Sequence, residues 1–568
     1  MNFRAEVVKM LEKETKLKAL EIDSLIEIPP NLEMGDFAFP CFVLAKKYKK
    51  SPAQIAEDLL KKIKPTIKIS KIEVKGPYLN FFIDRNILNA RVIEQVLKEK
   101  NSYGEIKGDK SVVLVESPGP NTNKPLHAGH LRNILLGDSI TKILLSQGKK
   151  VHIVNVVNDR GVHICKSMLA YKKFGKDQTP EKVNKKSDHF VGDYYVKYAQ
   201  EEKKNPAIEQ EVQEMLVKWE NGDKETLKLW KTMNSWSLKG MAETYNRLGF
   251  KIEKEYFESD TYKHGKDIVL DGLKKGVFEK DKEGAIIFDL ENKALGKKVL
   301  LRPNGTSVYI TQDLYMAKLR YSDYKFDEMI YVVGNEQEYH FKVLFETFKA
   351  LGWKFADKCH HFSYGMIELP EGKMKSREGT VVDTDELIVQ VENIARKELQ
   401  KRYPDIKQKE LDKRTEIISM GAVRFFFLKF DPIKNFVFNP KESLSFEGET
   451  GPYVQYAHAR IASILRKNKE DMTVINYAGL KSPEEQKLIA KIAEYPETIS
   501  NAAKSYKPSL ITRYLLDLAQ ILNEYYHKTP ILKAEEDLRT ARIGLILSVK
   551  QVLKNGLGLL GITAPEEM

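Results

Sequence analysis

The chain has 568 residues, of which 42% are hydrophobic and 30% charged. This composition is that of a folded, soluble protein, so extensive disorder is excluded, and the length predicts roughly two to four domains. The formal net charge of +13 favours a polyanionic partner such as nucleic acid, although a generally lysine-rich proteome would also account for it. No run of about 18 apolar residues occurs, so no membrane span is expected.

The N-terminal residues and the cysteines bear on the cellular compartment. The first ten residues alternate charged and apolar side chains and lack the apolar core of a secretion signal. Cys41, Cys165 and Cys359 are far apart and show no paired spacing, which predicts neither a disulfide framework nor a structural zinc site. We therefore expect a cytoplasmic protein without zinc.

Residues 1–100 are predicted to form a small α/β domain. Apolar residues recur at helical spacing between Ser51 and Ile63, with a proline in the first turn. Short runs of β-type residues follow at 72–74 and 79–83. The domain should therefore combine helices with a small sheet.

Residues 101–400 are predicted to form a doubly wound parallel sheet. An apolar strand at 112–116 is followed by a turn-rich loop, a helix at 128–147 and a second apolar strand at 151–157. This is the spacing of a βαβ unit, which places the two strands parallel to each other. Further strand-like runs lie at 329–333 and 362–366.

The remaining segments are predicted to be helical. The polar, highly charged stretch near 175–235 is typical of an insertion, residues 401–440 form a connecting stem, and residues 441–568 form an all-helical domain. Long amphipathic helices are expected at 450–468, 483–504, 508–528 and 535–555. The expected fold class is therefore α/β, with a Rossmann-type sheet between a small N-terminal α/β module and an all-helical C-terminal domain.

The run from Asn121 to Arg132 contains the sequence His-Ala-Gly-His directly after a strand and at the start of a helix. A helix start offers unpaired backbone N–H groups to phosphate, and Gly129 allows a planar adenine to approach the backbone. His127 and His130 are three residues apart, so both can point toward one phosphate chain. By itself such a pair is about as often a metal pair or a chance surface pair, but its position after the strand favours phosphate binding.

His-Ala-Gly-His resembles the HIGH signature of the class I aminoacyl-tRNA synthetases. The later run 372–382, Gly-Lys-Met-Lys-Ser-Arg-Glu-Gly-Thr-Val-Val, resembles the second signature of that class, a lysine-bearing loop. It departs from the usual pattern, because Ser376 occupies the place of the second lysine and Lys375 comes one position early. The family resemblance implies that Lys124 can supply the missing charge, so it stays open which of Lys124, Lys373 and Lys375 approaches the triphosphate.

Further motifs narrow the resemblance to arginyl-tRNA synthetases and extend it over nearly the whole chain. They include the runs 35–40, 116–121, 157–161, 186–195, 309–313, 337–340 and 450–460. The resemblance implies that the N-terminal module, residues 1–100, contacts tRNA and that the C-terminal domain, residues 441–568, binds the anticodon. It implies an arginine–tRNA ligase of protein biosynthesis, which forms arginyl-adenylate from ATP and transfers the arginine to tRNA(Arg).

The resemblance also assigns the candidate site residues. The candidate catalytic residues are His127, His130, Lys124, Lys373 and Lys375, and those for ATP are His127, Gly129, His130 and Lys373. The candidate arginine-binding residues are Glu116, Asn121, His130, Tyr309, Asp313 and Gln337. Mg²⁺ is expected to arrive with ATP and to be held by phosphate oxygens. The family is further expected to be monomeric and to need bound tRNA before it activates arginine.

Two alternatives remain. One is a related class I enzyme, either a synthetase for another amino acid or a small-molecule nucleotidylyltransferase. The other is a non-catalytic tRNA-binding protein that keeps the fold. The length of the chain speaks against a bare nucleotidylyltransferase, and the presence of His127, His130, Glu116 and Asp313 speaks against a loss of catalysis.

Overall fold

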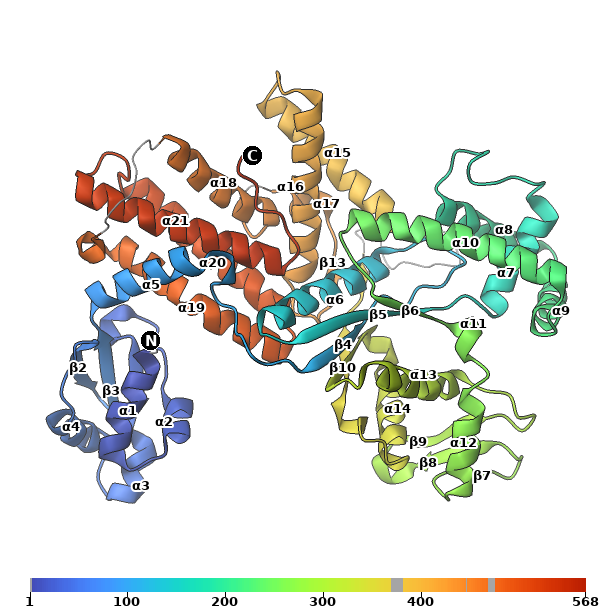
Figure 1. The fold of residues 1–568 in the computed structure, drawn as a ribbon, viewed down its shortest axis with the longest axis horizontal. Helices are drawn as coiled ribbons and strands as arrows, with labels where there is room; N and C mark the ends of the chain where they lie inside the picture. Colours follow the sequence, from blue (N-terminus) through green and yellow to red (C-terminus); the bar gives the residue numbers. More distant parts are fainter. Residues whose placement is uncertain (1–2, 369–381, 446, 468–475) are drawn as a thin grey trace. The chain divides into compact units, whose positions relative to one another are not determined.

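The structure is a computed structural model that describes residues 3–368, 382–445, 447–467 and 476–568. Its internal contacts divide the chain into two compact units (Figure 1). The smaller unit consists of residues 1–100, 465–494 and 521–552, and the larger unit consists of residues 101–464, 495–520 and 553–568. Each unit therefore combines segments from distant parts of the sequence.

The N-terminal 100 residues form helices around an antiparallel sheet. The elements are α1 (Phe3–Thr15), α2 (Ala19–Leu25), β1 (Phe37–Pro40), α3 (Ala45–Tyr48), α4 (Pro52–Lys62), β2 (Ile69–Lys75), β3 (Tyr78–Ile83) and α5 (Arg85–Glu99). The strand order is β1-β3-β2. Helix α4 begins where predicted, because the Ser51 hydroxyl accepts the N–H of Gln54 (3.3 Å) and Pro52 occupies the first turn. Both predicted strand runs lie within β2 and β3.

Five parallel strands form the central sheet of the larger unit. In sheet order they are β11 (Cys359–Tyr364), β10 (Glu328–Gly334), β4 (Val112–Glu116), β5 (Lys150–Val157) and β6 (Lys254–Phe257). Every neighbouring pair is parallel, and Val113, Leu114 and Val115 of β4 are completely buried, as expected for a strand covered on both faces. The predicted doubly wound sheet is confirmed.

The order of the strands changes direction beside β4. From β4 the chain runs through helix α6 (Ala128–Ser146) to β5 on one side, whereas β10 joins β4 on the other side. In open α/β sheets the carboxyl ends of the strands at such a switch point form a crevice for ligands. The end of β4 at Glu116 and the end of β10 at Gly334 therefore mark the expected position of a site.

The strand predicted at 362–366 is displaced in the structure. Strand β11 starts three residues earlier and pairs with β10 from Cys359 onward. The apolar pattern did not predict this part of the strand, because the side chains of His360 and His361 are polar. The chain leaves the sheet after Tyr364, because the N–H of Gly365 donates to the carbonyl of Pro432 instead (2.9 Å).

A lobe that shares its hydrophobic core with the central sheet follows β6. It contains α11 (Glu258–Thr261), α12 (Gly265–Lys274), β7 (Glu279–Lys280), β8 (Ile286–Leu290), β9 (Gly296–Leu301), α13 (Tyr309–Tyr324) and α14 (Glu338–Ala350). Strands β7, β8 and β9 form an antiparallel sheet. Leu314, Phe326 and Phe348 are completely buried in the core, which fixes the orientation of α13 and α14 beside the central sheet.

Four helices follow β5, namely α7 (Val162–Phe174), α8 (Ser187–Lys204), α9 (Ile208–Glu220) and α10 (Lys224–Arg247). The stretch predicted as an insertion, 175–235, includes α8, α9 and the first half of α10. These helices pack with α7 around a core that contains Phe190, Tyr198 and Met233. The many charged residues of this stretch therefore lie on helices that share an apolar core.

The remainder of the chain is mainly helical. It contains β12 (Ile367–Glu368), α15 (Thr384–Arg402), α16 (Gln408–Leu428), β13 (Phe436–Val437), α17 (Pro440–Ser443), α18 (Gly451–Lys467), α19 (Pro483–Ser505), α20 (Pro508–Lys528) and α21 (Glu536–Leu559). Four of these helices, α18 to α21, match the long helices predicted from the sequence within a few residues. Ser482 caps α19, since its hydroxyl accepts the N–H of Glu485 (3.2 Å) and the Glu485 carboxylate accepts the N–H of Ser482 (2.9 Å).

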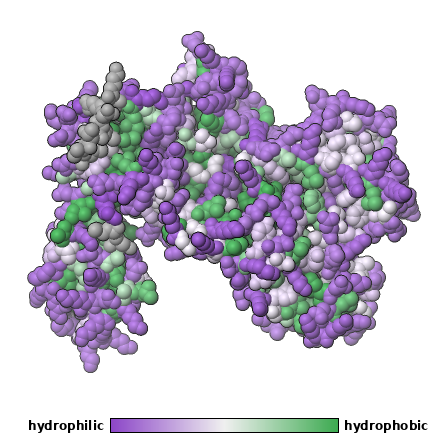
Figure 2. All heavy atoms as spheres, in the orientation of Figure 1, coloured by the Kyte–Doolittle hydropathy of each residue, from purple (hydrophilic) through white to green (hydrophobic). Residues whose placement is uncertain are grey.

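The surface agrees with the charged composition. Figure 2 shows that hydrophilic side chains cover most of the visible face and that hydrophobic ones appear in separate patches. No helix within the described residues is long and apolar enough to cross a membrane.

Candidate active site

A cleft of about 700 Å³ opens at the carboxyl ends of β4 and β10, where the switch point places it. Nine of the residues predicted from the sequence line this cleft: Glu116, Asn121, Lys124, His127, Gly129, His130, Tyr309, Asp313 and Gln337. The two others, Lys373 and Lys375, lie outside the described residues.

His127 and His130 hold each other at the start of α6. The Nδ1 atom of His127 accepts the N–H of Gly129 (3.1 Å), and the Nδ1 atom of His130 accepts the N–H of His127 (3.2 Å). Their ring centroids are 3.8 Å apart. Because each Nδ1 atom is an acceptor, the ring proton of each neutral imidazole must be on Nε2. The turn therefore presents two Nε2–H donors of fixed tautomer.

The backbone of this turn differs from the sequence-based expectation of free N–H groups. The N–H of Ala128 donates to the carbonyl of Val382 (3.1 Å), and the N–H of Gly129 is used by His127. These groups are therefore already paired and cannot bind a phosphate as they stand. The start of α6 therefore offers fewer free N–H groups than expected, and the two imidazoles and Lys124 line the cleft beside it.

Both histidines are neutral at physiological pH. Burial, with the Lys124 ammonium as a smaller cause, lowers the pKa of His127 to about 3. Burial, His127 and Lys124 together lower the pKa of His130 well below its usual value. Burial also lowers the pKa of Lys124, which has no ion-pair partner among the described residues. The end of the cleft at the start of α6 thus holds two neutral donors and one lysine without an ion pair among the described residues.

Gly129 packs closely against the ring of His127. A Cβ atom at this position would lie 3.0 Å from Cε1 and Nδ1 of the His127 ring, a distance that only a shift of the ring could relieve. The structure therefore gives a second reason for the glycine, beside the close approach of a ligand. A side chain here would displace His127.

Glu116 and Arg320 form an ion pair on the floor of the cleft. The side chain of Glu116 is 14% exposed and that of Arg320 only 2%. Burial raises the pKa of Glu116, against the opposing effect of Arg320, and nearby Asp313 raises it further. Among the described residues, Nε and Nη2 of Arg320 have no hydrogen-bond acceptor. One oxygen of Glu116 is therefore already paired with the guanidinium of Arg320.

Asp313 is more accessible than Glu116. It lies one turn into α13, its side chain is 42% exposed, and its Oδ2 atom lies 2.7 Å from Nε2 of His340 on α14. The hydrogen bond fixes one oxygen and leaves the other directed to solvent in the cleft. Asp313 is therefore well placed to accept hydrogen bonds from a cationic ligand.

Asn121, Tyr309 and Gln337 lie at the rim of the cleft. Asn121 belongs to the loop after β4, which pairs in parallel with Asn158. Tyr309 opens α13 and is 78% exposed, and Gln337 is exposed in the turn after β10. The three side chains thus come from separate elements and face the same opening.

Both flanks of the segment that carries Lys373 and Lys375 contact the start of α6. On the N-terminal side, the buried guanidinium of Arg132 donates to the carbonyl of Gly365 and also to that of Pro432 (2.9 Å). On the C-terminal side, the N–H of Thr384 donates to the carbonyl of Leu126 (2.9 Å). Described residues on both sides of this segment therefore contact the chain near the His127 turn.

The sequence analysis missed three functional candidates of the cleft. Arg320 follows Asp313 at a spacing of two helical turns, which places both on one face of α13 and was a usable signal. His340 ends a motif that had been recognised, without a role for the histidine. Glu258, whose pKa is raised chiefly by burial, follows a short strand, and no pattern distinguished it.

Comparisons with known proteins cover the whole chain. Residues 92–440 match the catalytic-domain model of the class I tRNA synthetases (R), residues 454–568 the DALR anticodon-binding domain, and residues 1–83 the arginyl-tRNA synthetase N-terminal domain. The arginine–tRNA ligase of Treponema denticola is 47% identical over 99% of this chain and 98% of its own length. That of Bacteroides thetaiotaomicron is 43% identical over 94% of both chains. The solved arginyl-tRNA synthetase of Thermus thermophilus superimposes with a TM-score of 0.86 at 28% identity, over the full length of both chains.

Proposed function

The chain belongs to the arginyl-tRNA synthetase family of class I enzymes, and on that premise we propose that it activates L-arginine with ATP and transfers it to the 3′ end of tRNA(Arg). One observation carries the proposal. Two neutral imidazole donors and the partly buried Lys124 line one part of a single cleft, and carboxylates that include Glu116 and Asp313 line another. Such a cleft suits a substrate pair with phosphates at one end and a guanidinium at the other.

The first step is attack by the arginine carboxylate on the α-phosphorus of MgATP, with pyrophosphate as the leaving group. The protein needs no nucleophile of its own, because positioning and stabilisation of charge on the phosphoryl oxygens suffice. The Nε2–H groups of His127 and His130 donate to phosphate oxygens, and Lys124 balances charge on them. Mg²⁺ arrives as part of the substrate and is held by phosphate oxygens.

Neutral imidazoles suit this role for a physical reason. A neutral donor hydrogen-bonds to a phosphate oxygen without titrating near pH 7, so its contribution stays constant over the working range. The Nδ1 hydrogen bonds from the backbone keep each proton on the nitrogen that faces the cleft. Lys373 and Lys375, by resemblance to the family, are proposed to add positive charge to the same phosphates.

The guanidinium of arginine binds mainly to Asp313 in this proposal. A planar guanidinium forms paired, charge-assisted hydrogen bonds with a carboxylate, which a lysine ammonium cannot reproduce. Glu116 adds negative potential from the floor, where Arg320 already occupies one of its oxygens. Asn121, Gln337 and His130 are proposed to hold the α-amino and carboxylate groups, and Tyr309 to close the side of the pocket.

In the second step a hydroxyl of the terminal ribose of tRNA attacks the carbonyl carbon of the adenylate. The ester bond forms, the bond to phosphate breaks, AMP leaves, and the hydroxyl proton is released. Residues 1–100 are proposed as the additional tRNA-binding domain, 101–400 as the catalytic domain with its insertion at 175–235, 401–440 as the stem and 441–568 as the anticodon-binding domain. The match to the anticodon-binding domain and the net charge of +13 support the binding of tRNA. By resemblance to the family, we further propose a monomer that works in the cytoplasm.

The proposal is tested by charging total tRNA with each labelled amino acid in the presence of MgATP. We expect label from arginine alone to become acid-precipitable, with one AMP formed for each arginine attached. Attachment of another amino acid, or no attachment of arginine while the protein binds ATP, would overturn the assignment.

A further inference from the structure

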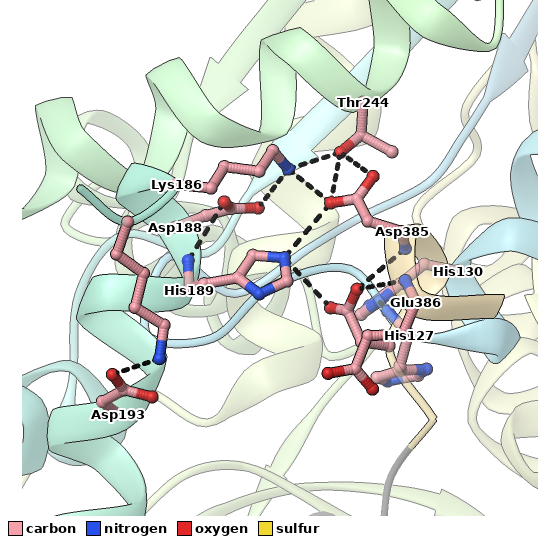
Figure 3. A network of polar contacts seen from close by, with 11 residues as sticks. His127, His130, Lys186, Asp188, His189, Asp193, Thr244, Asp385 and Glu386 are labelled. Atoms are coloured by element: carbon pink, nitrogen blue, oxygen red, sulfur yellow. Dashed lines mark hydrogen bonds and ion pairs between the residues drawn. The ribbon is translucent and has the colours of Figure 1, made fainter. Parts of the chain in front are cut away.

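Beside the cleft, a cluster of charged side chains joins α8, α10 and α15 (Figure 3). We propose that Lys186 and His189 of this cluster are positioning residues for arginine activation, which hold the backbone segment that pairs with the His127 turn. The proposal rests on the proposed function. We call the cluster the α8–α15 clamp, and its members are Lys186, Asp188, His189, Thr244, Asp383 and Asp385.

Lys186 is the centre of the α8–α15 clamp. Its ammonium donates to Oδ2 of Asp385 (2.7 Å), to the hydroxyl of Thr244 (2.7 Å) and to Oδ2 of Asp188 (3.1 Å). Figure 3 shows these contacts converging from three helices. Lys186 precedes the first residue of α8, Thr244 lies on α10, and Asp385 lies in the first turn of α15. One side chain therefore fixes the start of α15 against two helices of the segment that follows β5.

His189 is the second basic side chain of the α8–α15 clamp. Its Nε2 atom is 3.1 Å from Oδ2 of Asp385 and 3.5 Å from Oδ2 of Asp383. The other oxygen of Asp383 caps α15, because it accepts the N–H groups of Asp385 (2.8 Å) and Glu386 (3.2 Å). Oδ2 of Asp383 is buried and has no hydrogen bond among the described residues. His189 thus lies 3.5 Å from a buried carboxylate oxygen that has no hydrogen bond among the described residues.

The segment held by the α8–α15 clamp is the one that contacts the catalytic turn. Asp383 and His127 pair in an antiparallel bridge. On either side of the bridge, the N–H of Ala128 donates to Val382 and the N–H of Thr384 donates to Leu126. A shift at the start of α15 would therefore also move the backbone of His127, which is paired with it.

The helices of the α8–α15 clamp are packed too closely to adjust freely. Asp188 is completely buried, and a Cβ atom at Gly240 of α10 would lie 2.2 Å from its Oδ1 atom. The glycine therefore allows α8 and α10 to approach until Asp188 touches the α10 backbone region. Because α8 and α10 are packed rigidly, they can fix the position of the start of α15.

The carboxylates of the cluster resemble a cation site, but a protein cation already fills it. Ligand-type atoms of Asp188, His189 and Asp385 lie within 4.8 Å of one another. The ammonium of Lys186 lies between two of these carboxylates, and a divalent ion there would be repelled by it. The charges indicate an internal ion network that positions backbone and not a metal centre.

Two adjacent lysines provide the test. Lys185→Gln removes an ammonium that pairs with exposed Asp193 on α8 itself (2.5 Å), whereas Lys186→Gln removes the centre of the α8–α15 clamp. Each variant is measured for kcat and KM in arginine-dependent exchange of pyrophosphate into ATP with tRNA present, and for Tm. Lys186→Arg tests rescue by a retained positive charge.

We expect Lys186→Gln to lower kcat by about 10- to 100-fold, because a small misplacement of a catalytic group has an effect of that size. The KM for arginine should stay within about twofold, since arginine binds to other residues. Lys185→Gln should match wild type, and Lys186→Arg should recover most of kcat. The proposal would be overturned if kcat of Lys186→Gln stayed within about twofold of wild type, or if Lys185→Gln lost as much. A kcat of Lys186→Arg as low as that of Lys186→Gln would also overturn it.

If Lys186→Gln does not fold, His189→Gln decides the question. Glutamine keeps an N–H donor near Asp385 but cannot carry a charge beside Asp383. We expect kcat to fall by at least about threefold with an unchanged arginine KM, and an unchanged kcat would overturn the proposal. Exchange by the wild-type protein tests the proposed function independently, so failure of the α8–α15 clamp would leave that function standing.

Discussion

The backbone of Asp383 pairs with that of His127, although the two residues lie in distant parts of the chain. This bridge joins the start of α6, which carries both histidines, to the start of α15. The segment that carries Lys373 and Lys375 ends directly before this bridge. The first class signature is therefore paired, through the backbone, with the described residues Val382, Asp383 and Thr384, which follow that segment in the chain.

His130→Ala should slow activation without weakening arginine binding much. Loss of one transition-state donor typically costs roughly 3–4 kcal/mol, or about 10²–10³ in rate. The variant should therefore show this loss in kcat for pyrophosphate exchange. His360→Ala, on β11 and outside the residues that line the cleft, is the matched control. A loss of less than about threefold in His130→Ala would remove that residue from the mechanism.

Asp313→Asn should weaken arginine binding selectively. A charge-assisted hydrogen bond is worth about 1.5–3 kcal/mol, so the KM for arginine should rise roughly 10- to 100-fold while that for ATP changes little. Asp323→Asn serves as the control, because Asp323 is on the same helix but pairs with Lys254 and Tyr256 (2.7 Å each). Equal arginine KM values in the two variants would show that Asp313 does not bind the substrate.

The neutral histidine pair should affect the pH dependence of stability. An unfolded histidine titrates near pH 6.5, whereas burial lowers the pKa of His127 to about 3 in the folded protein. Between these values the unfolded chain binds more protons, so acidification lowers the free energy of unfolding. Tm measured from pH 7 to pH 5 should therefore fall less steeply in His127→Gln than in wild type. Parallel curves would contradict the assignment of a neutral, buried His127.

Arg320 and Glu116 should be coupled in stability. Removing one partner of a buried ion pair costs about 3–5 kcal/mol, because the other charge is left uncompensated. Arg320→Met should therefore lower Tm strongly, and the double variant Arg320→Met with Glu116→Gln should recover part of the loss. Additive losses in the double variant would show that the two side chains do not interact energetically.

Much of the fold follows from patterns that are local in the sequence. The apolar run of β4, the turn-rich loop after it and the helix beginning at Ala128 were predicted because each has a strong local signal. The long helices of the C-terminal region were predicted for the same reason. The start of β11 was not predicted, because His360 and His361 are held in the strand by pairing with β10. Such pairing cannot be recognised from the sequence of one strand alone.

The site was predictable where a motif places several residues together. His127, Gly129 and His130 form one turn, and the residues from Tyr309 to Asp313 open one helix. The partners of these residues were not predictable. Arg320 neutralises Glu116, and Lys186 fixes Asp385, only because separate helices bring them together. Long-range ion pairs of this kind depend on tertiary packing and have no characteristic spacing.

The most direct test of the central claim is pyrophosphate exchange into ATP, run with each of the amino acids in turn, with and without total tRNA. The account predicts exchange with arginine and with no other amino acid, since a guanidinium forms paired, charge-assisted hydrogen bonds with the Asp313 carboxylate that a lysine ammonium cannot reproduce. Exchange supported by lysine or by an uncharged amino acid in place of arginine would contradict it.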